Sequence, residues 1–278
     1  YGVVKIAIKA ASGSTLTNIT KQSIVTQLKR YNVASVRPVI VDPEITKLLL
    51  TTNVKYDNKT TTKTSDTLKS AVLTTLTNYN NNTLTKFEGV FRFSKVTGLI
   101  DNTDSSILSN ITNLKIRKDF QPALAASTKY NVFFRNALYN PHSGHNMAAG
   151  GILESSGFKV SGDATTIFYL DDDGASNVRR YSFAGSTRVY ANNTQGTINY
   201  NTGAIVLNSL SVLSVENIRG AAATKIELTV VPASNDIVPV RDQILEIDTA
   251  NSSITVTADT FVGGSADAGV GYTTTSSY

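Results

Sequence analysis

The chain has 278 residues, with 26 Lys and Arg against 21 Asp and Glu, a formal net charge of +5 and no cysteine. The lack of cysteine excludes disulfides, thiol nucleophiles and cysteine-based zinc sites, so stability must come from packing and hydrogen bonds. The length favours two domains, and the many Thr, Ser and Asn residues favour a β-rich assembly protein. No apolar run approaches the about 18 residues of a membrane span, so we expect no membrane partner.

The positive charge is concentrated in the first part of the sequence. Residues 1–120 hold 17 Lys and Arg against 8 Asp and Glu, a net +9, whereas residues 121–278 hold 9 against 13, a net −4. Such a split indicates either nucleic-acid binding or contact between unlike halves of neighbouring copies. The basic residues lack the interleaved aromatic side chains of a stacking platform, so we expect contacts between protein subunits and no nucleic-acid partner.

Residues 1–120 show both strand and helix patterns. The chain opens on Tyr1 without Met, so we expect a fragment of a longer protein. Apolar residues alternate with polar ones at first and later recur at helical spacing, with Leu68, Val72, Leu76 and Tyr79 on one face. In chain order we predict a strand at 4–8, a helix at 18–31, strands at 35–41 and 44–56, helices at 65–79 and 86–100, and a strand at 107–118. This order is that of a ferredoxin-like split βαβ domain, an α+β layer with helices on one face of the sheet.

Helical periodicity ends at Gln121-Pro122, and residues 121–232 are predicted to form an antiparallel β domain. Strand-like runs flank the turn sequences Asp171–Asn177 and Asn201–Gly203, which indicates consecutive hairpins. The short strands that we predict are 130–137, 157–160, 167–170, 178–183, 188–190, 197–200, 204–207 and 225–231.

The acidic turn Asp171-Asp172-Asp173-Gly174 invites a calcium interpretation, which fails on spacing. An EF-hand loop counted from Asp171 needs an oxygen ligand at its fifth position, Gly at its sixth and Glu at its twelfth. This sequence has Ala175, Ser176 and Ser182 at those positions. We therefore interpret the segment as a solvated turn in which Asp and Gly supply the backbone geometry.

The two histidines, His142 and His145, lie in one predicted loop at residues 140–151. Nothing beside them completes a set of metal ligands or a catalytic triad, so we predict a flexible loop, no metal and no cofactor.

A C-terminal arm and tail are predicted at residues 233–278. The arm carries an apolar run that can pair with a sheet edge, and charges that can set its register. It either contacts a second copy or completes the β domain of its own chain. The tail, residues 265–278, is predicted to be disordered or ordered by a partner. The candidate subunit-interface residues are Asp236, Arg241, Asp242, Ile244, Leu245, Glu246 and Ile247.

Several stretches together resemble the C-terminal part of the baseplate wedge protein of T-even-type contractile-tailed phages, within the wider J-like baseplate family. They are residues 168–174, 196–203 and 232–248 in the second half, and 36–43 and 100–108 in the first.

The resemblance implies an architectural subunit of the virion, assembled in the host cytoplasm, and no enzyme. It implies pairing with a second copy and with another wedge protein, in a ring around the baseplate hub that changes shape when the sheath contracts. The family has no catalytic residues to transfer.

The residues also raise two other functions. The Tyr- and Asn-rich β half and its acidic turn are also compatible with a glycan-binding or adhesin module. A hydrolase using Asp171 and Asp173 is disfavoured, because adjacent carboxylates on one turn cannot flank a substrate at the roughly 5 to 9 Å that glycosidases need.

Overall fold

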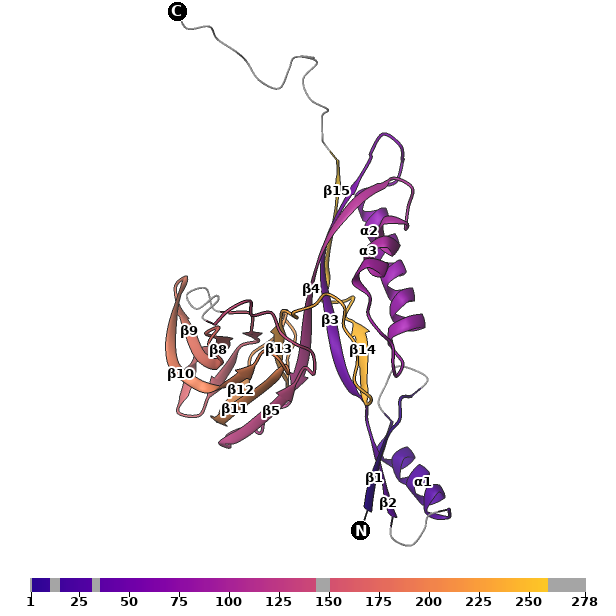
Figure 1. Cartoon of the computed structure of the whole chain (residues 1–278). Helices are drawn as coiled ribbons and strands as arrows, with labels where there is room; N and C mark the ends of the chain where they lie inside the picture. Colours follow the sequence, from indigo (N-terminus) through magenta and orange to yellow (C-terminus); the bar gives the residue numbers. More distant parts are fainter. Residues whose placement is uncertain (1, 11–15, 32–35, 144–150, 260–278) are drawn as a thin grey trace, which may run out of the picture.

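The computed structural model describes residues 2–10, 16–31, 36–143 and 151–259. Its fold class is α+β and rich in strands, as predicted. The described strands form three sheets, with two, six and seven strands (Figure 1). His145 and the predicted C-terminal tail at 265–278 lie outside the described residues.

The first sheet belongs to a small N-terminal unit, here called the βαβ unit. Strand β1 (Gly2–Ala7) pairs in parallel with β2 (Val36–Val41), and helix α1 (Asn18–Lys29) connects them and packs beside β2. Thr17 caps the helix, because its hydroxyl accepts a hydrogen bond from the amide of Thr20 at 3.2 Å. The residues Asp42 and Pro43 connect this unit to the next strand.

The six-stranded sheet, here called the main sheet, is built around two long antiparallel strands, β3 and β4. Helix α2 shows the apolar face that was predicted, because Leu68, Val72, Leu76 and Tyr79 are all buried. The predicted helix at 86–100 is shorter and begins only at Phe93, since Glu88 has a left-handed backbone with φ of 64°. The elements are β3 (Glu44–Tyr56), α2 (Ser65–Tyr79), the short π-helix η1 (Asn80–Leu84), α3 (Phe93–Asp101) and β4 (Ile107–Phe120).

Strands from the end of the chain complete the main sheet. Both β14 (Gln243–Ile247) and β15 (Ser253–Ala258) pair in parallel with β3, one after the other along the same strand (Figure 1). Strand β13 (Ile226–Val230) pairs with β4, and β6 (Glu154–Ser155) pairs with β13. The ferredoxin-like order is not confirmed, because β1 and β2 form a sheet of their own and the partners of β3 are β4, β14 and β15.

The seven-stranded antiparallel sheet, here called the β domain, contains the two predicted hairpins, β8–β9 and β10–β11. The predicted strands at 188–190 and 197–200 are parts of one bulged strand, and the predicted strand at 225–231 belongs to the main sheet instead. The strands lie in the order β12 (Val212–Val215), β7 (Phe158–Val160), β8 (Asp163–Asp172), β9 (Asn177–Ala184), β10 (Thr187–Asn199), β11 (Ala204–Leu210) and β5 (Thr128–Phe133).

One continuous cluster of buried apolar side chains joins the main sheet and the β domain. It includes Leu48 and Ile116 of the main sheet and Leu170 and Leu207 of the β domain. The shared core fixes the β domain against the side of the main sheet, where Figure 1 shows it projecting.

Candidate functional site

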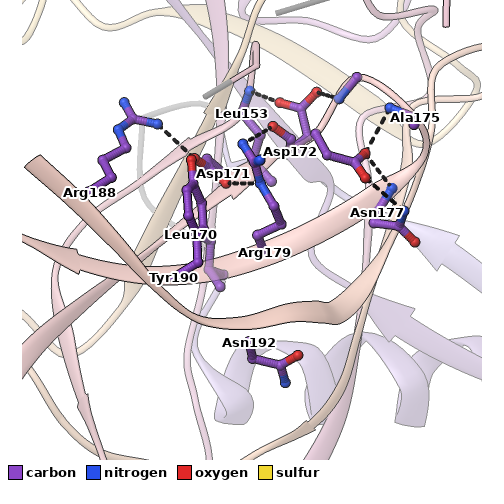
Figure 2. A network of polar contacts seen from close by, with 12 residues as sticks. Leu153, Leu170, Asp171, Asp172, Ala175, Asn177, Arg179, Arg188, Tyr190 and Asn192 are labelled. Carbon is purple, nitrogen blue, oxygen red and sulfur yellow. Dashed lines mark hydrogen bonds and ion pairs between the residues drawn. The ribbon is translucent and has the colours of Figure 1, made fainter. Parts of the chain in front are cut away.

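Asp172, at the end of β8, is a buried acceptor for several parts of the β domain (Figure 2). Its side chain is 1% exposed. One carboxylate oxygen accepts from the amides of Ile152 and Leu153 at 2.6 and 2.7 Å, and the other accepts from the hydroxyl of Tyr200 at 2.7 Å. Burial, and then the hydrogen bond to Asp172, raise the pKa of Tyr200. The carboxylate therefore ties the 151–153 segment to β8 and to the end of β10.

Its neighbour Asp171 points to the other face of the strand and holds two arginines. Its oxygens accept from Nε of Arg179 at 2.9 Å, from Nη1 of Arg188 at 2.7 Å and from the hydroxyl of Tyr190 at 2.9 Å. The guanidinium of Arg188 lies 4.5 Å from the ring centre of Tyr181, and that of Arg179 lies 4.2 Å from the ring centre of Tyr190. These contacts link β8, β9 and β10 across one face.

The interpretation of the acidic segment as a solvated turn is right only for Asp173. This residue accepts from the amides of Ala175 and Asn177 at 2.7 and 2.9 Å, and Gly174 has a φ of 71°. Burial tends to raise the pKa of Asp173, but the bonds from Asn177 and Ala175 lower it overall. For Asp171 and Asp172 the interpretation is wrong, because both are buried and paired as the last residues of a strand.

A second buried ionic group, here called the ion cluster, was missed by sequence analysis. Arg117 of β4 is 2% exposed, and its guanidinium lies 2.9 Å from Asp119, 3.2 Å from Glu227 and 2.9 Å from Asp248. Lys47 of β3 lies 3.4 Å from Asp119. The cluster thus connects β3, β4, β13 and the residue that follows β14.

Three of the seven predicted interface residues of the arm are buried inside the chain. Ile244, Leu245 and Ile247 are buried in β14, so their apolar surface is used by the main sheet of the same chain. Arg241 and Asp242 are exposed just before β14, and Glu246 is half-buried. For these three charged residues a role in a subunit interface stays a prediction.

Asp236 has a different position from the rest of the arm residues. Its carboxylate accepts from the amide of Phe93 and from Nη1 of Arg92, both at 2.8 Å. It therefore caps α3 from a distant part of the sequence, at a helix start whose own residue Arg92 makes no side-chain cap. These bonds, from Arg92 first and then Phe93, lower the pKa of Asp236.

A cleft of about 500 Å³ lies where the main sheet meets β5. Lys118 and Glu44 form an ion pair in its wall, and burial, helped by the charge of Arg135, lowers the pKa of Lys118 to about 7. Arg135 also pairs with Glu44 at 3.0 Å.

His142 is exposed, and the described part of the chain contains no group of three His, Cys, Asp or Glu side chains arranged to hold a metal ion. Charged side chains gather around Asp171 and Asp172, in the ion cluster and in this cleft. Within each group the side chains bind one another, as expected of a structural framework.

Two parts of the chain match models of known protein families. Residues 1–41 match C-terminal domain I of the baseplate structural protein gp6, and residues 48–119 match C-terminal domain III. Both matching models thus describe baseplate structural protein gp6. The predicted resemblance to the C-terminal portion of a baseplate wedge protein is confirmed. A search of curated proteins finds no match.

The gp6 matches coincide with the units of the fold. The domain I match covers the βαβ unit, and the domain III match runs from β3 to β4 with the helices between them. A structural role in a phage baseplate follows, in contact with other baseplate proteins and within the tail of the virion. Among the described residues, no helix has the length and apolar character that crossing a membrane requires.

Proposed function

We propose that this chain is a baseplate wedge subunit that pairs with a second copy and with another wedge protein, in a ring around the hub that rearranges when the sheath contracts. The observation that carries the proposal is that two gp6 domains follow one another along the chain, on two separate structural units. A subunit that must hold neighbours in a ring needs such distinct bodies to carry distinct contacts.

The connection between the two gp6 domains supports a subunit that rearranges. Only Asp42 and Pro43 separate β2 from β3, and among the described residues no strand of the βαβ unit pairs with the main sheet. Pro43 restricts the backbone of this short link, and Lys21 of α1 pairs with Asp42 at 2.6 Å. Two bodies joined in this way can change their relative orientation while each keeps its own hydrogen bonds.

The main sheet and the β domain, in contrast, have the properties of one rigid support. They share a buried core, and the ion cluster and the network around Asp171 and Asp172 hold their strands in register. Motion at the link at Asp42-Pro43 would therefore displace the βαβ unit as a whole relative to the rest.

The test is assembly of the baseplate in cells infected with a phage that lacks this gene. Supplying the complete protein should restore contractile tails with full baseplates in negative-stain images. In vitro, light scattering after size-exclusion chromatography should show a complex with purified neighbouring baseplate proteins. Tails with normal baseplates in the absence of the gene product would contradict the proposal.

A further inference from the structure

The described elements of the βαβ unit, β1, α1 and β2, bury few side chains. Helix α1 contains no buried residue, and neither does β1. In β2 only Pro38 and Ile40 are buried. A two-stranded sheet and an isolated helix of 12 residues are each marginally stable in water, so three such elements without a core need further contacts.

Apolar side chains of this unit are instead exposed. Ile19 of α1 and Tyr31 after it are 81% and 87% exposed. Val3 and Val4 of β1 and Val36 of β2 are exposed as well. Among the described residues β1 pairs with β2 alone, and its other edge has no described strand partner. In the part of the chain that the structure describes, the unit therefore has exposed apolar side chains and a strand edge without a partner.

The unit and its link to β3 together account for the whole net charge of the protein. Residues 1–43 hold six Lys and Arg and a single carboxylate, Asp42, so twenty basic and twenty acidic residues remain for 44–278. Lys21 pairs with Asp42. Within the described ranges, the other five basic side chains have no carboxylate at ion-pair distance. They are Lys5, Lys9, Lys29, Arg30 and Arg37.

We propose that the βαβ unit is a docking module whose core is completed by an acidic surface, carrying an apolar patch, of another baseplate protein. The proposal rests on the function proposed above and specifies the chemistry of one partner. Five cations with no ion-pair partner among the described residues lie in the same unit as exposed aliphatic groups, and together they fit a surface with carboxylates at its rim and apolar residues at its centre.

A second copy of this chain fits less well. Most of the carboxylates of its other units already take part in ion pairs or hydrogen bonds within the chain, as for Asp171, Asp172, Glu227 and Asp248. A nucleic acid also fits less well, because it would leave Val3, Val4 and Ile19 exposed and would find Tyr31 as its sole stacking group among the described residues of the unit.

The experiment measures binding of the full chain to each of the other purified baseplate proteins of the same phage, by calorimetry at several salt concentrations. We expect an acidic protein of this set to bind, and hydrogen exchange of residues 2–41 to slow in the complex. The test variant reverses Lys5, Lys29 and Arg37 to Glu. The matched control reverses Lys59, Lys69 and Lys129, which are exposed and lie outside the unit.

The expected result is an affinity at least tenfold lower for the test variant, with a weaker salt dependence, and little change for the control. A second variant, Ile19→Ser with Tyr31→Ser, should weaken binding at every salt concentration. Circular dichroism confirms that each variant keeps the main sheet and the β domain.

Three outcomes would overturn the inference. In the first, both triple variants bind as the wild type does. In the second, residues 2–41 gain protection through a concentration-dependent dimer of the chain alone. In the third, a 30-base-pair DNA duplex protects them and no baseplate protein does. A separate assembly experiment distinguishes this inference from the proposed function. Normal baseplates with the test variant would contradict the inference alone. Failure of the wild-type protein to enter baseplates would contradict the proposed function.

Discussion

Gly151 packs directly against Asp172. A Cβ at position 151 would lie 2.6 Å from the backbone oxygen of Asp172 and closer still to its carboxylate, and the backbone of Gly151 is left-handed with a φ of 61°. Both facts require glycine, because other residues strain at this φ and no Cβ fits the space. The approach lets the next two amides, of Ile152 and Leu153, reach the carboxylate.

Replacing Asp172 by Ala should lower the free energy of unfolding by about 3 to 5 kcal/mol, since it leaves buried donors of Ile152, Leu153 and Tyr200 without an acceptor. Chemical denaturation of the two proteins measures the difference. Asp163→Ala is the matched control: this aspartate also accepts hydrogen bonds from amides, those of Thr165 and Thr166, but at the partly exposed start of β8. Equal losses for the two variants would contradict the structural role of Asp172.

Arg117→Met should destabilise the protein by about 3 to 5 kcal/mol, because Asp119, Glu227 and Asp248 would lose their shared cation while staying largely buried. Lys115→Met, on the same strand, removes a solvent-exposed pair with Glu154 and should cost less than about 1 kcal/mol. Thermal unfolding followed by circular dichroism compares them. A larger loss for the Lys115 variant would refute the importance of the ion cluster.

Truncation after Val231 should give an aggregating protein rather than a folded monomer. It removes β14 and β15, exposes the edge of β3 and takes Leu245, Ile247 and Ile254 from the core. Truncation after Asp259 keeps every described strand and serves as the control. Size-exclusion chromatography distinguishes the outcomes. A stable, monomeric product ending at Val231 would show that the arm is dispensable for folding.

The stabilising contribution of Asp236 should disappear in acid. Its pKa in the folded protein is lowered from 3.8 by Arg92 and Phe93, so the contribution is fully present above pH 3.8 and is lost as the pH falls through the lower, folded value. At pH 7, Asp236→Asn should cost about 0.5 kcal/mol, because the amide oxygen can still cap α3 but the charge that pairs with Arg92 and favours the helix start is lost. Urea titrations from pH 7 to pH 2 should show the wild type and the variant converging. A difference that grows toward low pH would contradict this assignment.

Local patterns in the sequence predicted the elements that depend on local structure. The bounds of β3 were predicted correctly at residues 44–56, and the buried face of α2 was read from the spacing of Leu68, Val72 and Leu76. Both follow from alternation or helical periodicity, which a short segment carries by itself. The two hairpins of the β domain follow from turn residues between strand-like runs.

Pairings between distant segments left no comparable pattern. Nothing near Ile244 or Ile254 indicates that β3, some two hundred residues earlier, is the partner of both β14 and β15. The ion cluster was missed for the same reason, because Arg117 meets Glu227 and Asp248 only after the sheet has formed. Asp171 and Asp172 were assigned to solvent because acidic residues beside Gly favour turns, whereas here the strand extends through both.

The return of the chain to β3 also sets the order of events during synthesis. The ribosome releases β3 and β4 early, but the strands that close the outer edge of β3 are among the last described elements to be made, after the whole β domain. Until then that edge is open to other nascent chains. A polypeptide that terminates before β14 therefore lacks a finished main sheet. Only copies that include β14 and β15 enter assembly with the edge of β3 covered.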